Sequence, residues 1–150
     1  IVKRQSLAPL LSALTEQFQT RLLEKGLNID GAGLDNENAI FDLKWTSEVL
    51  ANILDNAIKY SPCGSAIQFN VENSQMFTKI VVKDEGIGVS AHEHNKIFQR
   101  FYRSDKVADQ AGIGVGLYLA RQIIEAQGGF IKLDSVIGKG SSFSIYLPTE

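Results

Sequence analysis

The stretch DEGIG, Asp84 to Gly88, follows the run KIVVK of residues 79–83. β-Branched residues favour strands, and a glycine lets another group approach the backbone without a Cβ clash. This order predicts a strand that ends with an acid at the mouth of a loop, and the loop needs bare backbone at two alternate positions. A turn-capping role and a ligand-binding role for Asp84 both fit this local pattern.

Length and composition limit the number of domains and the classes of protein to which this chain can belong. The 150 residues suit one domain, and a formal net charge of −2 disfavours nucleic acid as a partner. Cys63 is the only cysteine, so no internal disulfide can form, which is typical of a cytoplasmic protein. No apolar run approaches the roughly 18 residues that span a bilayer. Because the chain begins at Ile1 without a methionine, we expect a piece of a longer protein.

The first half of the chain predicts two helices separated by short extended pieces. Apolar residues recur at helical spacing over residues 6–25, and Gly26 follows them. Extended pieces are predicted at residues 27–29 and 39–41. A second helix is predicted from Trp45 to Ser61, before Pro62. Its expected apolar face consists of Trp45, Val49, Ile53, Leu54, Ala57 and Ile58.

The second half predicts strands, a long connection and a third helix. Residues 66–72 and 78–84 have the alternation of an antiparallel strand pair. Residues 85–111 are polar and poorly periodic, and so long a connection is usually functional. A third helix before Gly128 and a hairpin of residues 130–135 and 141–148 follow. The expected fold is a two-layer α/β sandwich, in which a mixed, mostly antiparallel sheet of about five strands packs on about three helices.

Polar residues line one face of the predicted second helix. Glu48, Asn52, Asn56 and Lys59 follow one another at spacings of four, four and three, so they share a face. Asparagine is a poor helix former, whereas its amide oxygen is a good ligand for Mg²⁺. The alternative is a solvated polar face opposite the apolar one.

A glycine-rich segment precedes the third helix. In AGIGVGLYLA, residues 111–120, the glycines Gly112, Gly114 and Gly116 lead into the helix, where backbone amides can meet phosphate oxygens. The spacing is not that of a dinucleotide-binding fingerprint. The preceding cations Arg100 and Arg103, interleaved with aromatic residues, fit either a mixed surface loop or a lid over phosphates.

Five segments, taken in order, resemble one family. EVLANILDNAIKYS, DEGIG, IFQRFYR, GIGVGLYLAR and GKGSSF resemble the N box, first glycine box, F box, and second and third glycine boxes of the catalytic, ATP-binding domain of bacterial sensor histidine kinases. That domain belongs to a superfamily shared with gyrase B, mismatch-repair ATPases and a family of heat-shock chaperones. The resemblance implies a Bergerat-type ATP-binding fold and ATP and Mg²⁺ as cofactors.

The resemblance also implies a role for each matching residue. The carboxylate of Asp84 would accept a hydrogen bond from the adenine amine, with Gly86 and Gly88 leaving room for the base. Glu48 would polarise the attacking imidazole, and the glycines before the third helix would form the hinge of a lid. The expected catalytic residues are Glu48, Asn52 and Lys59, and the expected metal ligands are Asn52 and Asn56. The expected nucleotide-binding residues are Asn52, Asn56, Lys59, Tyr60, Asp84, Gly86, Gly88, Arg100, Arg103, Gly112, Gly114, Gly116, Leu117 and Ser141.

The implied reaction transfers the γ-phosphate of ATP to a histidine on a separate dimerisation domain, for relay to an aspartate of a response regulator. We expect residues 1–150 to be the catalytic domain, on the cytoplasmic side of a membrane-anchored homodimer. His92 precedes Glu93 as an acceptor histidine precedes its acid, but it lies between the first glycine box and the F box, so we do not expect it to be the acceptor. The alternatives are a hydrolytic ATPase of the same superfamily and a nucleotide-binding regulatory module without chemistry.

Overall fold

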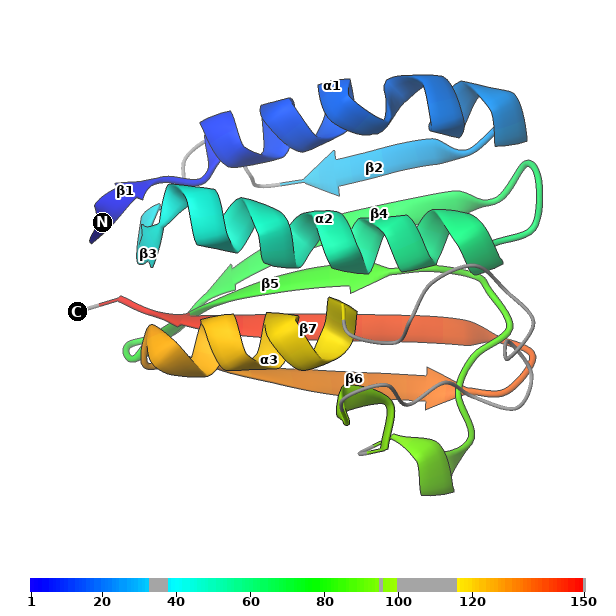
Figure 1. Ribbon diagram of the computed structural model, residues 1–150. Coiled ribbons are helices and arrows are strands. Elements are labelled where there is room, and N and C mark those ends of the chain that lie inside the picture. The colour runs from blue at the N-terminus through cyan, green and yellow to red at the C-terminus, as the bar shows by residue number, and fades with distance from the viewer. Residues whose placement is uncertain (33–37, 95, 100–115, 150) are drawn as a thin grey trace.

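The computed structural model describes residues 1–32, 38–94, 96–99 and 116–149. Within these ranges a five-stranded sheet forms one layer and three α-helices form the other (Figure 1). The elements are β1 (Val2–Ser6), α1 (Ala8–Lys25), β2 (Asn28–Ala32), β3 (Asn38–Asp42), α2 (Leu43–Tyr60), β4 (Ala66–Asn73), β5 (Phe77–Lys83), the 3₁₀ turns η1 (Ala91–Glu93) and η2 (Lys96–Phe98), α3 (Gly116–Ala126), β6 (Phe130–Val136) and β7 (Gly140–Pro148).

The strands of the main sheet follow the order β2-β4-β5-β7-β6. β2 pairs with β4 in parallel, and the other pairs are antiparallel. A parallel pair needs a crossover connection, and here the segment between β2 and β4 contains α2. The predicted mixed, mostly antiparallel two-layer α/β sandwich is therefore confirmed.

A second, two-stranded sheet joins β1 to β3, with Val2 opposite Asp42. Nothing in the sequence predicted β1, because VKRQS has no apolar alternation and most of the strand is exposed. Polar contacts fix it instead: Gln5 Nε2 donates to Phe41 O at 2.8 Å, and Arg4 Nη1 donates to Thr149 O at 3.0 Å. The two ends of the chain consequently lie at the same end of the molecule (Figure 1).

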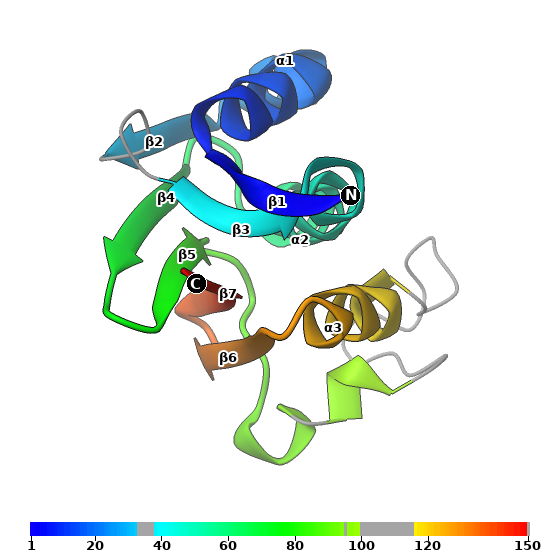
Figure 2. The same cartoon turned by 90° about the vertical axis from the view of Figure 1, so that its left-hand side faces the viewer.

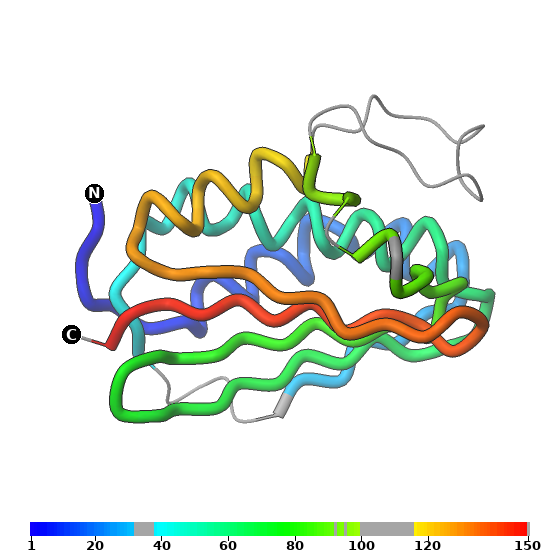
Figure 3. The backbone as a smooth tube through the Cα atoms, turned by 90° about the horizontal axis from the view of Figure 1, so that it is seen from below, coloured from blue at the N-terminus to red at the C-terminus, as the bar shows by residue number. Residues whose placement is uncertain are grey.

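All three helices cover the same face of the main sheet (Figure 3), and α2 lies between α1 and α3 (Figure 2). The side chain of Asp42 caps α2 by accepting from Trp45 N at 2.9 Å. The prediction that Trp45 belongs to the buried face of this helix is wrong. Trp45 is 51% exposed, while the next residue, Thr46, points inward and bonds Gln127. Thr46 and not Trp45 is in register with Val49, Leu50 and Ile53.

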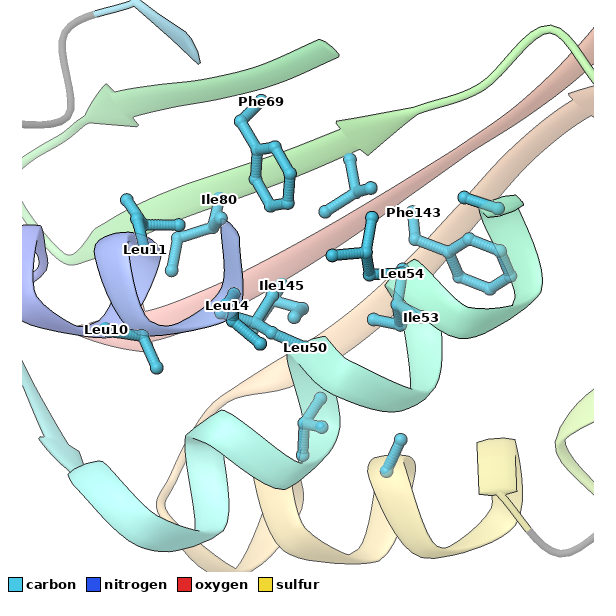
Figure 4. Packing of buried hydrophobic residues seen from close by; sticks show 14 of the residues in the cluster. Leu10, Leu11, Leu14, Leu50, Ile53, Leu54, Phe69, Ile80, Phe143 and Ile145 are labelled. Carbon is cyan, nitrogen blue, oxygen red and sulfur yellow. The ribbon is translucent and has the colours of Figure 1, made fainter. Parts of the chain in front are cut away.

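The core fills the space between the helices and the sheet (Figure 4). α1 and α2 contribute leucine side chains such as Leu14 and Leu50, and the sheet contributes Ile80, Phe143 and Ile145. Because α2 is buried on its apolar face, its polar face is turned toward the start of α3 and the loop after β5. That placement sets the geometry of the candidate site.

Candidate functional site

Asp84 lies directly after β5 and is 8% exposed. Its backbone N–H donates to Ser141 O at 2.8 Å. Its Oδ1 accepts two backbone hydrogen bonds, from Gly86 N at 2.9 Å and from Ser141 N at 3.1 Å. No described residue donates to Oδ2. The carboxylate is thus held in one orientation, and within the described ranges its Oδ2 is left without a donor.

The surroundings of Asp84 also change its acidity. Burial raises the pKa of this carboxyl above the ordinary value of 3.8, although the hydrogen bonds from Gly86 and Ser141 act in the opposite direction. A further donor at Oδ2 would stabilise the charged form. The group is therefore suited to recognise an N–H donor.

The glycines near Asp84 allow backbone segments to pack against one another. A Cβ on Gly86 would lie 2.8 Å from Tyr60 O, and one on Gly88 would lie 2.2 Å from Val136 O. Gly140, with φ +120, would place a Cβ 2.1 Å from Asp84 O. The sequence predicted that Gly86 and Gly88 leave room for a base. In the structure these two positions also pack against the end of α2 and the end of β6, and the approach of a base to them stays a prediction.

The polar face of α2 reaches the first residue of α3. Asn52 Nδ2 donates to Gly116 O at 3.3 Å, and the absent Cβ of Gly116 would contact the Asn52 amide at 3.6 Å. Asn56 is half-buried, and its amide has no hydrogen bond to any described residue. Glu48 is exposed and, within the described ranges, unpaired. The structure therefore brings two of the predicted motifs together through Asn52.

The two asparagine amides carry oxygen atoms, which are the ligands that Mg²⁺ prefers. Asn52 uses its Nδ2 on Gly116 O, which leaves its Oδ1 without a partner among the described residues. The Asn56 amide oxygen is likewise unengaged there. Mg²⁺ takes oxygen ligands and usually completes its shell with waters and phosphate oxygens, so two protein oxygens suffice. Asn52 and Asn56 thus fit the ion that the resemblance implies.

Lys59 has a partner that the sequence analysis did not consider. Its Nζ lies 3.1 Å from Asp55 Oδ2, and Asp55 Oδ1 lies 2.6 Å from Arg21 Nη1 of α1. Burial alone would raise the pKa of Asp55, but the hydrogen bonds and charges of Arg21 and Lys59 outweigh it and lower the pKa. A phosphate that contacts Lys59 would share this cation with Asp55. Only the i,i+4 spacing of Asp55 and Lys59 signals this pair in the sequence.

Ser135 is a second residue that sequence reasoning missed. Its Oγ accepts from Val89 N at 2.7 Å, donates to Gly140 O at 2.9 Å and lies 2.9 Å from Ser141 Oγ. A lone serine in a strand gives no sequence signal. In the β6–β7 pairing, Ser135 lies directly opposite Ser141, whose backbone amide donates to Asp84 Oδ1.

The described part of the connection after Gly88, up to Gln99, is docked on the domain. Phe98 is buried, and its ring meets Phe143 edge-on at 6.3 Å, with the Arg121 guanidinium 5.3 Å from the ring centre. His94 Nε2 donates to Val89 O at 3.0 Å.

Tyr60 and Leu117, two further predicted site residues, lie half-buried at the end of α2 and the start of α3. The predicted site residues Arg100, Arg103, Gly112 and Gly114 lie outside the described residues.

A family profile described as histidine kinase-, DNA gyrase B-, and HSP90-like ATPase matches residues 41–150. The chain belongs to this family of ATPases. The match includes α2, Asp84, the start of α3 and the β6–β7 turn, which are the segments that build the site. No helix in the described ranges is long and apolar enough to cross a membrane.

Relatives of this chain include sensor kinases. The chain is 42% identical to sensor histidine kinase WalK of Bacillus subtilis (strain 168) over 106 residues, which cover 68% of this chain and 17% of that protein. It is 30% identical to sensor protein SrrB of Staphylococcus aureus (strain MRSA252) over 146 residues, 96% of this chain and 25% of that protein. The chain therefore spans a quarter or less of the length of these two relatives.

Solved structures of other proteins share the fold of this chain. The mycobacterial sensor histidine kinase MprB superposes with a TM-score of 0.86 at 23% identity, over 99% of this chain and 97% of that chain. Full-length ShkA, crystallised in complex with AMPPNP, superposes with a TM-score of 0.83 at 24% identity, over 98% of this chain and 31% of that chain.

Proposed function

We propose that the chain is the catalytic domain of a sensor histidine kinase, which binds Mg-ATP and transfers the γ-phosphate to a histidine on a separate dimerisation domain. The observation that carries the proposal is the Asp84 carboxylate. It is buried, its Oδ1 is fixed by two backbone amides, and its Oδ2 is open to a donor. The sensor-kinase relatives and the nucleotide analogue bound by ShkA support the same assignment.

In this function each part of the site binds a different part of the nucleotide. Asp84 Oδ2 accepts from the adenine amine, while Ser141 lies beside it and Tyr60 flanks the base or ribose. Asn52 and Asn56 hold Mg²⁺, which neutralises charge on the phosphates. The amide end of α3 at Gly116 faces the phosphate oxygens, and Lys59 adds a cation. Catalysis then consists mainly of positioning and charge neutralisation.

The acceptor imidazole has to approach from outside the chain. Glu48 is exposed on the same face of α2 as Asn52 and Asn56, one helical turn from Asn52. Its free carboxylate can polarise the N–H of an incoming imidazole and raise the nucleophilicity of the other ring nitrogen. We therefore assign to Glu48 the activation of the acceptor and to Asn52 and Lys59 the positioning of the phosphoryl group.

The partners follow from the proposed reaction. They are the dimerisation domain that carries the acceptor histidine and a response regulator whose aspartate receives the phosphate. The parent protein is proposed to be a membrane-anchored homodimer, with residues 1–150 as one domain on the cytoplasmic side. The names of the relatives, sensor histidine kinase and sensor protein, support this arrangement.

A transfer assay tests the function. The domain is mixed with ATP labelled at the γ-phosphate and a separately produced dimerisation domain from a sensor kinase. Acid-labile, base-stable phosphate on that domain is expected. Release of inorganic phosphate without transfer would favour a hydrolytic ATPase, and binding without either product would favour a regulatory module.

Asp84→Asn is expected to weaken ATP binding by ~1.5–3 kcal/mol, because an amide replaces the charged acceptor of the adenine amine. Isothermal titration calorimetry measures the change. Asp134→Asn is the matched control, since Asp134 is exposed on β6 and has no side-chain hydrogen bond within the described ranges. Undiminished ATP affinity in folded Asp84→Asn would remove Asp84 from the base pocket.

ATP affinity is also expected to fall at acid pH through Asp84. Because burial raises the pKa of this carboxyl, it takes up a proton at a higher pH than the 3.8 of an ordinary aspartate. The neutral carboxyl is a weaker acceptor, so affinity declines as pH falls through the raised pKa. The measurement is a pH series of ATP dissociation constants for the parent and Asp84→Asn. An identical acid decline in both proteins would assign the effect to another group.

A further inference from the structure

The hydroxyl of Ser135 has a fully determined set of hydrogen bonds. A serine hydroxyl has one proton to donate and two lone pairs to accept with. The carbonyl of Gly140 can only accept, so Ser135 gives its proton to Gly140 O at 2.9 Å. The amide of Val89 can only donate, so it occupies one lone pair of Ser135 Oγ at 2.7 Å.

This assignment fixes the direction of the remaining contact. Ser135 has no second proton, so the 2.9 Å contact between the two hydroxyls requires Ser141 to donate to Ser135. The proton of Ser141 is then used within the protein, and its oxygen is left with lone pairs only. Toward any ligand, Ser141 Oγ is an acceptor.

The backbone donors around Asp84 are also engaged in hydrogen bonds within the protein. The backbone amides of Gly86 and Ser141 both point to Asp84 Oδ1. Of the side-chain oxygens of Asp84 and Ser141, Asp84 Oδ2 and Ser141 Oγ have no donor among the described residues, and both can offer a ligand only lone pairs. A ligand edge that donates fits here, whereas a carbonyl oxygen finds no side-chain partner.

We propose that Ser135 is a specificity-determining positioning residue: by taking the proton of Ser141, it makes the base pocket favour a 6-amino purine over a 6-oxo purine. This inference rests on the proposed function, because it requires the purine to lie at Asp84. Ser135 acts through Ser141 and does not itself touch the base.

Removing the Ser135 hydroxyl leaves Ser141 Oγ, Val89 N and Gly140 O without their partner, and the consequences for Ser141 and Val89 are separable. The Ser141 proton becomes free to rotate toward the ligand, where it can donate to a 6-oxo group. Val89 N loses its acceptor, which loosens the start of the segment after Gly88. The second effect acts on all nucleotides alike, so a ratio of two affinities isolates the first.

The test compares ATP with inosine triphosphate, whose base has a carbonyl oxygen in place of the 6-amino group and an N1–H in place of the bare N1. The N1–H is the same for the parent and every variant, so the change in preference between proteins reports on the 6-position. Dissociation constants are obtained by displacement of a fluorescent ATP analogue. Ser135→Ala is expected to reduce the preference for ATP over inosine triphosphate by about five- to tenfold, the worth of one hydrogen bond. Ser135→Cys is expected to change it in the same direction, because a thiol is a weak acceptor.

Three variants serve as controls. Ser135→Thr retains the hydroxyl and is expected to keep the parental preference. Ser142→Ala removes a neighbouring hydroxyl that has no hydrogen bond to any described residue. This variant is also expected to keep the parental preference for ATP. Adding Ser141→Ala to Ser135→Ala removes the freed donor, so the relaxed preference is expected to disappear.

Equal losses of affinity for both nucleotides in Ser135→Ala, or a relaxed preference that survives in the double variant, would overturn the inference. Asp84→Asn separates this outcome from failure of the proposed function. If Asp84→Asn weakens ATP binding while Ser135→Ala and Ser135→Cys keep the parental preference, only the role of Ser135 is wrong. If Asp84→Asn binds ATP as the parent does, the base pocket itself is misplaced.

Discussion

Asn56→Ala is expected to lower the rate of phosphotransfer about 100-fold or more while leaving the free energy of unfolding almost unchanged. The Asn56 amide has no hydrogen bond to any described residue, so its removal costs the fold no bond. Alanine is also a better helix former than asparagine, and α2 extends on both sides of this position. The substitution would therefore weaken the binding of Mg²⁺ and leave the fold intact. Transfer of labelled phosphate across a Mg²⁺ titration, with thermal unfolding alongside, measures both quantities.

Two other variants make this result specific. Asn52→Ala removes the hydrogen bond to Gly116 O, so it should lower both activity and stability, the latter by about 1 kcal/mol. Gln122→Ala changes an exposed residue of α3 without a hydrogen bond in the described ranges, and it should alter neither. If Asn56→Ala retains the parental rate and Mg²⁺ dependence, the ligand assignment fails.

Gly88→Ala is expected to destabilise the domain by about 3 kcal/mol or more, a large part of the stability of an ordinary domain. Gly88 has φ +75, which a residue with a Cβ rarely adopts, and the added Cβ would lie 2.2 Å from Val136 O and 2.8 Å from Val136 C. Both atoms are backbone and cannot rotate away. Chemical denaturation measures the free energy of unfolding.

Gly64→Ala separates the backbone strain from the clash. Gly64 has φ +81, close to that of Gly88, but a Cβ there meets nothing within 4 Å. It should cost about 1 kcal/mol, the strain of the left-handed conformation alone. Equal losses in the two alanine variants would mean that the turn after β6 moves aside, and that its packing on Gly88 contributes little.

Most of the fold could be predicted from hydrophobic periodicity. The apolar repeats of α1 and α2 and the alternation of β4 and β5 follow from one-sided burial, which sequence patterns report directly. β1 could not be predicted, because end-to-end polar contacts hold it and its residues are mostly exposed. Trp45 was assigned to the wrong face because a large apolar residue at the first turn of a helix fits two registers.

The sequence indicates candidate site residues where a residue type is unfavourable for the local fold, and their roles stay predictions. An acid between a strand and two glycines, and two asparagines in mid-helix, are costly choices that indicate a function. The relation between Ser135 and Ser141 was not predictable, since it depends on strand register and on the direction of single protons. The packing of Gly86 on Tyr60 and of Gly88 on Val136 was not predictable, because these residues are distant from each other in the sequence.

The two ends of the chain lie beside β1 and β3, at the opposite end of β5 and β7 from Asp84 (Figure 1). β7 alone has 9 residues, so this separation is on the order of 30 Å. A dye, an affinity tag or a surface linker attached beside Val2 or Thr149 therefore lies far from the DEGIG loop. Immobilisation through either end should report the same nucleotide affinity as free solution.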